Sequence, residues 1–379
     1  MLPSCMSPPR SALVLAVLFL WSVPAWPAPS SHKKTGRTAR PSARTARKAR
    51  VRPRPALPAV PPALVLPEGA SARDREIGEA CRTGLGKTPG AVVAMDPYTG
   101  RVISVVNPRE AVQAAYTPCS VFKIVVAMAG LSEGVIRPET QYNCRGGSCW
   151  MWAGHGPIDL RRALAQSCNP FFEAVGERLG YSRVQRYAHL LGLGTVSGIN
   201  LPGEVPGRVP LSVTEREVGH LSSHAKGIAT SALQVGALLS TVINGGTVYQ
   251  PQLDLASGFV PKERWRLPPR TVLAGLADGF LGAVNEGSAA VAFDPDVIVA
   301  GKTGTCAGVG WFASYAPADN PEVVIVAFVR PGSGHGASAV ANRIYQNLYK
   351  PGTGTTLVES SEAPAPVGGL SPGRTPGIR

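Results

Sequence analysis

The chain has 379 residues, enough for one large domain or two ordinary ones, and its 44% apolar content is that of a globular protein. A wholly disordered or collagen-like chain is therefore excluded, although the 43 Gly and 36 Pro residues predict unstructured ends around a folded middle. The formal net charge of +14 is concentrated near the N-terminus, because residues 1–66 hold eleven basic side chains and no acidic one. This distribution does not support a uniformly basic nucleic-acid-binding body, so we expect no nucleic-acid partner.

The first 25 residues show the three parts of a secretory signal. Arg10 precedes the apolar run Ala12–Val23, and the small residues that follow favour cleavage after Ala25. The run is about half as long as a membrane-spanning helix, which favours a signal peptide over residues 1–25 rather than an uncleaved signal anchor. In either case the body is exported, so we expect a periplasmic or other extracytoplasmic location, with a membrane tether if the signal is uncleaved.

Two further segments have the composition of unstructured chain. Residues 26–66 are basic and rich in Pro and Ala, which predicts a disordered, solvated linker. A more specific interpretation is a tether to an anionic envelope surface, such as lipid headgroups or cell-envelope polymer. Residues 351–379 are dominated by Gly, Pro, Ser and Thr without periodicity and predict a disordered C-terminal tail.

The region between these segments, residues 67–350, shows regular patterns of apolar residues. The predicted elements are a helix at 71–82, strands at 91–95 and 101–106, helices at 120–131, 159–165, 170–179, 182–191 and 231–244, strands at 297–303, 310–315 and 323–329, and a helix at 337–349. The first two strands surround a Pro/Gly turn and predict a β-hairpin. Strands at both ends of a long helical block predict an α+β fold, in which the terminal segments complete one sheet and the block is inserted as a subdomain.

Whether the cysteines form disulfides depends on export. Without Cys5, six cysteines remain, and an oxidising compartment permits them to pair. Cys144 and Cys149 flank a Gly-Gly turn, which predicts a local disulfide. A metal site is not indicated, because no second Cys pair or His pair follows at ligand spacing.

Ser120 and Lys123 have the residue types of an activated nucleophile. Pro118 predicts that a helix begins just before them, and the three-residue spacing places both side chains on one helix face. A lysine activates a serine only when it is neutral, and burial or a second nearby cation lowers a lysine pKa. Taken alone, the pair also fits a helix cap and a snorkelling lysine.

Two further short motifs follow the Ser120-x-x-Lys123 motif. They are Ser167-Cys168-Asn169 in the helical block and Lys302-Thr303-Gly304-Thr305 at a predicted strand. In this order the three motifs resemble those of penicillin-binding proteins and serine β-lactamases. The resemblance to the penicillin-binding protein transpeptidase domain runs from about residue 85 to 350, and includes the segments 154–169, 198–204, 244–251 and 311–317.

This resemblance implies a fold and an activity. The fold is the β-lactamase/transpeptidase-like α+β architecture, an antiparallel sheet flanked by terminal helices with an inserted all-helical subdomain. The activity is that of a serine D,D-transpeptidase acting on the D-Ala-D-Ala stem peptides of peptidoglycan in cell-wall synthesis. β-Lactam antibiotics would be further ligands, and the chemistry requires no cofactor or metal.

The resemblance also implies catalytic roles. Ser120 would attack the peptide or β-lactam carbonyl, and Lys123 would act as the general base. Ser167 and Asn169 would relay protons and hold the substrate amide. Lys302 would supply positive potential that keeps the first lysine neutral and attracts the substrate carboxylate.

The strand motif would contact the substrate directly. The Thr303 and Thr305 side chains would hydrogen-bond the substrate carboxylate, and Gly304 completes the Lys-Thr-Gly motif. The backbone N–H groups of Ser120 and Thr305 would form the oxyanion hole.

The motifs leave more than one activity open. The run Ser120–Ile124 and the short gap between Thr305 and Trp311 also resemble a class D β-lactamase, whereas a D,D-carboxypeptidase or a β-lactam-sensing module would use the same nucleophile. Three cysteines lie beside the three motifs. They are interpreted either as small buried residues or as a disulfide or redox-sensitive thiol near the site, and the sequence does not pair them: Cys119, Cys168 and Cys306.

One segment departs from the family pattern. Residues 224–227 read His-Ala-Lys-Gly where the family usually has Gly-Gln-Gly, although the run Ser231–Gln234 that follows fits. We expect this departure to affect binding of the acceptor peptidoglycan strand more than acylation of Ser120.

Overall fold

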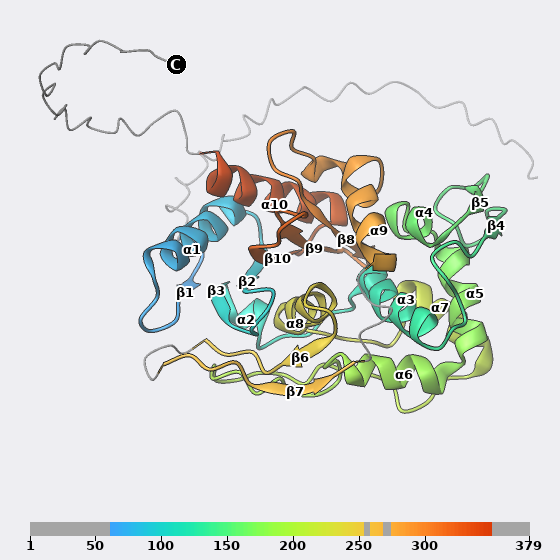
Figure 1. Cartoon of the computed structure of the whole chain (residues 1–379), viewed down its shortest axis with the longest axis horizontal. Coiled ribbons are helices and arrows are strands. Elements are labelled where there is room, and N and C mark those ends of the chain that lie inside the picture. The colour runs from blue at the N-terminus through green and yellow to red at the C-terminus, as the bar shows by residue number, and fades with distance from the viewer. Residues whose placement is uncertain (1–60, 254–257, 268–273, 351–379) are drawn as a thin grey trace, which may run out of the picture. The chain divides into compact units, whose positions relative to one another are not determined.

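The structure, a computed structural model, describes residues 61–253, 258–267 and 274–350 (Figure 1). The predicted signal peptide, the C-terminal tail and most of the predicted linker lie outside the described residues. The linker prediction was too long at its C-terminal end, because Leu64–Val65 form strand β1 and pair with Val106 and Val105. These two apolar residues therefore belong to the folded body. Within the described ranges, no helix is both long and apolar enough to cross a bilayer.

The body is built on a six-stranded sheet in which all neighbouring strands are antiparallel. The strand order is β1, β3 (Val102–Val106), β2 (Gly90–Met95), β10 (Val323–Val329), β9 (Val309–Ala316) and β8 (Ala300–Cys306). Because β10 pairs with both β2 and β9, segments from the two ends of the body complete one sheet, as predicted. The strand with the Lys-Thr-Gly motif, β8, lies at one edge.

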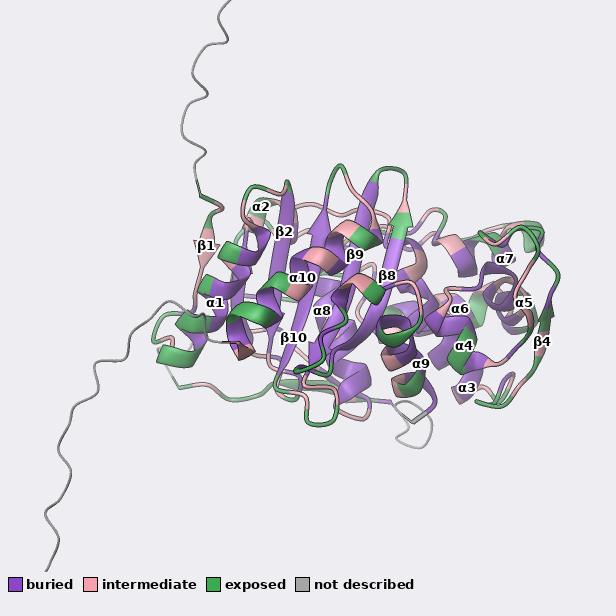
Figure 2. Ribbon diagram, turned by 90° about the horizontal axis from the view of Figure 1, so that it is seen from above, coloured by how far each residue is buried: buried purple, intermediate pink, exposed green. Residues whose placement is uncertain are grey.

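Helices cover both faces of this sheet (Figures 1 and 2). Helices α1 (Ala72–Leu85) and α10 (Gly334–Tyr349) pack on one face, and α8 (Ala232–Ile243) packs on the other. Alternate residues of β2 belong to the two cores, Val92 to the core with α1 and α10 and Val93 to the core with α8. Strands buried on both faces read as continuous apolar runs, which is why the sequence predicted them well.

A long block of chain between β3 and β8 forms the second part of the body. Its further helices are α2 (Pro108–Ala111), η1 (Cys119–Phe122), α3 (Lys123–Ser132), α4 (Leu160–Ala165), α5 (Asn169–Leu179), α6 (Tyr181–Leu190), α7 (Glu215–His224), α9 (Ala274–Asn285) and η2 (Ala290–Ala292). It also contains the two-stranded sheets β4 (Tyr142–Cys144) with β5 (Gly156–Ile158) and β6 (Thr247–Tyr249) with β7 (Glu263–Arg266). The α+β prediction is confirmed, but the inserted block is not all-helical. These strands have three or four residues each, too few to give a clear alternating pattern.

Candidate active site

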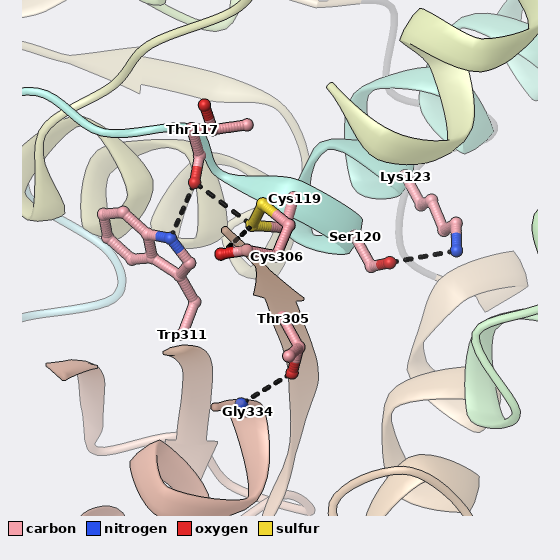
Figure 3. Close-up of a disulfide and its surroundings, with 8 residues drawn as sticks. All are labelled: Thr117, Cys119, Ser120, Lys123, Thr305, Cys306, Trp311 and Gly334. Carbon is pink, nitrogen blue, oxygen red and sulfur yellow. Dashed lines mark hydrogen bonds between the residues drawn. A yellow bond between two sulfur atoms is a disulfide. The ribbon is translucent and has the colours of Figure 1, made fainter. Parts of the chain in front are cut away.

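The proposed nucleophile lies in a tight turn that leads into a buried helix. Ser120 belongs to the 3₁₀ turn η1, where the sequence predicted α-helix, and Lys123 is the first residue of α3. In a 3₁₀ turn, side chains three residues apart are eclipsed. The turn therefore brings Lys123 Nζ to 3.0 Å from Ser120 Oγ (Figure 3).

Lys123 is completely buried, and neutral oxygen atoms surround its amine. Nζ lies 2.8 Å from the Ser167 carbonyl oxygen and 2.6 Å from Asn169 Oδ1, both of which only accept hydrogen bonds. A neutral amine would donate its two hydrogens to these oxygens and direct its lone pair toward a hydroxyl. Burial lowers the pKa of Lys123 to about 7, so the neutral form is accessible near neutral pH.

A second buried amine lies on β8. Lys302 Nζ is 2.9 Å from Ser167 Oγ, which is itself 3.1 Å from Lys123 Nζ. The Ser167 hydroxyl therefore bridges the two lysines. Burial and the charge of Lys123 hold the pKa of Lys302 well below its usual value. Because two charged amines this close repel each other, a charged Lys123 favours the neutral form of Lys302.

The motif that carries Ser167 is held in an unusual backbone conformation. Ser167 has φ +53°, the left-handed region that costs a residue other than glycine of order 1–3 kcal/mol. The turn directs both the carbonyl oxygen and the hydroxyl of Ser167 to Lys123. Asn169, at the start of α5, donates from Nδ2 to the Ser148 carbonyl oxygen at 2.9 Å, which orients its Oδ1 toward the lysine.

Strand β8 approaches the nucleophile turn closely at Gly304. A Cβ atom added there would lie 2.6 Å from the Pro118 carbonyl oxygen, closer than real Cβ contacts allow. The glycine of the Lys-Thr-Gly motif is thus explained by packing. On either side of it, Thr303 Oγ1 lies 2.6 Å from Ser288 Oγ, and Thr305 Oγ1 accepts a hydrogen bond from the Gly334 N–H at 2.7 Å.

These groups surround a cleft of about 530 Å³, a size suited to a small ligand or peptide end. Five of the predicted site residues line it: Ser120, Ser167, Asn169, Thr303 and Thr305. Lys123 and Lys302 lie behind this wall and reach it through their hydrogen bonds to Ser120 Oγ and Ser167 Oγ. The structure therefore brings the three motifs together from segments far apart in the chain.

Further cleft residues were not predicted as site residues. They are Trp150, His224, Ser288, Ser333, Gly334 and His335. They come from four separate segments and follow no spacing rule, so the sequence offered little signal. The exception is His224, which begins the segment that departs from the family pattern and lies 3.2 Å, through Nε2, from Asn169 Nδ2.

A disulfide beside the cleft joins the first motif to the third (Figure 3). Cys119, which has φ +53°, is bonded to Cys306, with Cα atoms 5.7 Å apart across 187 residues of sequence. Beside it, Trp311 Nε1 donates to the Thr117 carbonyl oxygen at 2.9 Å. The nucleophile turn is therefore joined covalently to the end of β8. Of the two interpretations for the motif cysteines, the disulfide holds for this pair.

The predicted disulfide between Cys144 and Cys149 was wrong, since both are free, buried thiols. Their sulfur atoms lie in one cluster with the Cys168 thiol and the His155 imidazole, with all four ligand atoms within 4.8 Å of one another. Closeness along the chain did not make Cys144 and Cys149 a pair, because the fold brings a third thiol, that of Cys168, to the same point.

Most of the body matches a known domain family. Residues 90–350 match the penicillin-binding protein transpeptidase domain. Stage V sporulation protein D of Bacillus subtilis is 28% identical over 282 residues, which are 62% of this chain and 44% of that protein. The peptidoglycan D,D-transpeptidase PbpA of Mycolicibacterium smegmatis is 26% identical over 325 residues, 65% of this chain and 63% of that protein. The chain thus spans less than two thirds of the length of these relatives.

Solved structures show the same architecture. PBP2 of Pseudomonas aeruginosa in complex with WCK 5153 matches with a TM-score of 0.66 at 22% identity, over 76% of this chain and 77% of that chain. The imipenem acyl-enzyme complex of penicillin-binding protein A from M. tuberculosis matches with a TM-score of 0.62 at 21% identity, over 73% and 78%. At such identities the likeness concerns the fold, and it confirms the transpeptidase-like architecture.

Proposed function

Because the chain belongs to the penicillin-binding protein transpeptidase family, we propose that it is a serine D,D-transpeptidase acting on D-Ala-D-Ala stem peptides of peptidoglycan in cell-wall synthesis. The observation that carries the proposal is the position of the Lys123 amine. It lies 3.0 Å from Ser120 Oγ and 3.1 Å from Ser167 Oγ, in a site that lowers its pKa to about 7. A base with this pKa suits proton transfer at neutral pH.

The acylation step follows from this geometry. Neutral Lys123 accepts the Ser120 hydroxyl proton while Oγ bonds to the carbonyl carbon of the penultimate D-Ala. The backbone N–H groups of Ser120 and Thr305 stabilise the developing oxyanion. The proton then passes through Ser167 Oγ to the nitrogen of the terminal D-Ala, which leaves as an amine. Attack of an acceptor amine on the ester reverses these proton transfers and releases Ser120.

The remaining motif residues bind the substrate. The carboxylate of the terminal D-Ala accepts hydrogen bonds from the Thr303 and Thr305 hydroxyls. When Lys123 is neutral, its charge no longer lowers the pKa of Lys302, and a protonated Lys302 adds positive potential behind the two hydroxyls. Asn169 lines the cleft, and its Nδ2 would exchange the contact with His224 Nε2 for the carbonyl oxygen of the substrate amide. β-Lactams carry an anionic group and a reactive carbonyl, so we propose that they acylate Ser120 as well. The M. tuberculosis relative forms such an acyl-enzyme with imipenem.

The first test uses the full chain and a fluorescent penicillin. We expect stable labelling of the wild type, no labelling of Ser120→Ala, and full labelling of the matched control Ser182→Ala, an exposed serine of α6 away from the cleft. Fast release of hydrolysed drug would favour a class D-like β-lactamase instead. Absence of labelling in the intact protein would overturn the proposed acylation.

A second test separates transpeptidase, carboxypeptidase and sensing activities. With a synthetic D-Ala-D-Ala pentapeptide and an excess of an acceptor amine, a transpeptidase forms the exchanged peptide, whereas a D,D-carboxypeptidase forms only the hydrolysed tetrapeptide. A sensing module would acylate once and form neither product. Mass spectrometry of the peptide products distinguishes the three outcomes.

We propose an extracytoplasmic location for the body, with residues 1–25 as export signal and the basic segment between residue 26 and the start of β1 as a linker toward an anionic envelope surface. The Cys119–Cys306 disulfide supports this location, because such bonds persist in oxidising compartments. The N-terminal sequence of the protein from its native host tests the signal, with cleavage after Ala25 expected. Binding of the full chain to anionic vesicles that does not weaken with salt would contradict the role of the linker.

A further inference from the structure

A cluster of three thiols and one imidazole lies beside the active site. It consists of Cys144, Cys149, His155 and Cys168, whose ligand atoms all lie within 4.8 Å of one another. Cys149 Sγ is 3.3 Å from His155 Nδ1. We propose that these four residues bind a structural Zn²⁺ ion, a site that the sequence spacing alone did not indicate.

The donor set fits zinc. Three thiolates and one imidazole form one of the common closed zinc sites, with tetrahedral geometry and bonds of about 2.3 Å to sulfur and 2.0 Å to nitrogen. Such bonds place neighbouring sulfur ligands about 3.8 Å apart. The observed spread of ligand atoms up to 4.8 Å therefore requires only a small contraction. Because four protein ligands fill the coordination sphere, no position remains for substrate or water, and the metal is structural.

A disulfide explains the cluster less well. Three thiols meet at one point, so a disulfide between any two would leave the third sulfur and the imidazole unused. Among the described cysteines, Cys119 and Cys306 already pair with each other, and Cys81 is a buried thiol of α1 in the core on the far side of the sheet. No described thiol outside the cluster is thus placed to pair with the third one.

The segment that carries the ligands needs a cross-link. Strands β4 and β5 have only three residues each, and a bare two-stranded hairpin is marginally stable at best. Between them, Trp150 and Trp152 are 60% and 90% exposed, so they contribute little to a core. The three thiols, in contrast, are at most 8% exposed. Burying the ligand atoms rather than the aromatic rings is the pattern of a small region that metal binding stabilises.

The backbone of this loop is also closed tightly around the cluster. Gly146 and Gly154 have positive φ, and a Cβ atom on either would come within 2.1 Å of a backbone carbonyl oxygen, that of Trp152 and Cys144 respectively. Only glycine permits this approach. The two glycines thus allow the chain segments with Cys144 and His155 to lie side by side.

The site would position catalytic groups without taking part in the chemistry. Cys168 lies between Ser167 and Asn169, the two residues whose oxygen atoms contact the Lys123 amine. The loop contacts the same motif a second time, because the Ser148 carbonyl oxygen accepts from Asn169 Nδ2 at 2.9 Å. A metal bound to Cys168 and to the loop would therefore fix the Ser167–Asn169 segment from behind.

The test measures metal directly on the full chain, independently of transpeptidase activity. After purification without a chelating resin, elemental analysis is expected to find close to one zinc per chain, and Cys168→Ser to lose it. The matched control Cys81→Ser removes another buried thiol and is expected to keep the metal. After exchange with Co²⁺, a sulfur-to-cobalt charge-transfer band is expected in the control and not in Cys168→Ser. Full-length wild type that binds neither Zn²⁺ nor Co²⁺ would overturn the proposal.

A measurement on the wild type covers the case in which Cys168→Ser fails to fold. Thiol alkylation followed by intact mass measurement is expected to show protection with Zn²⁺ and three additional labels after treatment with a strong chelator. Equal labelling with and without chelator would contradict the site, as would a disulfide between two of the cluster cysteines in the freshly isolated protein.

Discussion

The two sides of the cleft are stabilised by different means. On one side, β8 lies in a sheet that is buried on both faces and carries Lys302 and Gly304 on a rigid, apolar framework. On the other side, the Ser167–Asn169 motif is flanked by a glycine-rich hairpin with two exposed tryptophans. The first side depends on hydrophobic burial, which many residues share. The second depends on a few polar and sulfur contacts, so single changes there act locally.

Lys123 lies where the two sides meet, and replacing it is expected to have the largest effect on activity. Lys123→Met removes the proposed base and leaves an unbranched side chain one atom shorter, and acylation by penicillin is expected to fall by about 10³-fold. Thermal stability is expected to stay the same or rise, because the change removes a buried amine. Stopped-flow acylation together with thermal melting checks both outcomes. Near-normal acylation would exclude this lysine as the base.

Gly304→Ala perturbs the sheet side. The added methyl group would lie 2.6 Å from the Pro118 carbonyl oxygen, so β8 and the nucleophile turn must separate. Misplacement by about 1 Å is expected to slow acylation by about 10²-fold. Ala313→Gly, in the neighbouring strand β9, controls for a general loss of sheet stability, and it is expected to lower the melting temperature with a smaller effect on acylation.

Removing the Cys119–Cys306 disulfide measures how much this bond stabilises the sheet side of the cleft. The double variant Cys119→Ser and Cys306→Ser is expected to lower the free energy of unfolding by about 2–4 kcal/mol, because the bond closes a long loop of chain. Denaturant unfolding of wild type under oxidising and reducing conditions measures the same quantity. A double variant as stable as the oxidised protein would mean that packing alone holds the nucleophile turn against β8.

The pH dependence of acylation reports on the protonation of Lys123, which lies where the two sides of the cleft meet. Burial lowers the pKa of Lys123, the proposed base, to about 7, and only the neutral amine can accept the serine proton. Acylation is therefore expected to reach a plateau above pH 7 and to fall as pH decreases, about tenfold per unit below the pKa. Rates measured between pH 5.5 and about 9, with circular dichroism to verify folding, test this sign. A rate that rises as pH falls would contradict a neutral lysine base.

Trp150→Ala is expected to give the smallest effect and perturbs the hairpin side. The indole is 60% exposed at the cleft and donates to the Gln166 carbonyl oxygen at 2.7 Å. Its loss is expected to weaken penicillin acylation by only a few-fold, about 1 kcal/mol or less, because one exposed hydrogen bond is removed. Trp152→Ala, 90% exposed and outside the cleft lining, is the matched control. An equal loss in both variants would assign the effect to the hairpin as a whole.

Much of the fold was readable from local patterns. The doubly buried strands β2, β9 and β10 and the apolar helices α3 and α8 were predicted within a few residues, because burial on all sides leaves continuous apolar runs. The short strands β4 to β7 were missed. Their few residues are stabilised by tertiary contacts rather than by any pattern of their own.

The candidate reactive groups could be named from the chain alone, because they stand in short motifs: Ser120, Lys123, Ser167, Asn169 and the Lys-Thr-Gly residues of β8. Their arrangement became visible only in the fold, where the Ser167 hydroxyl bridges both lysines and burial lowers the pKa of each. The structure also decided the cysteine pairing, in favour of Cys119 with Cys306 and against the local pair. The reason is physical, because desolvation, charge repulsion and sulfur-to-sulfur distance depend on separations in space, which chain spacing does not encode.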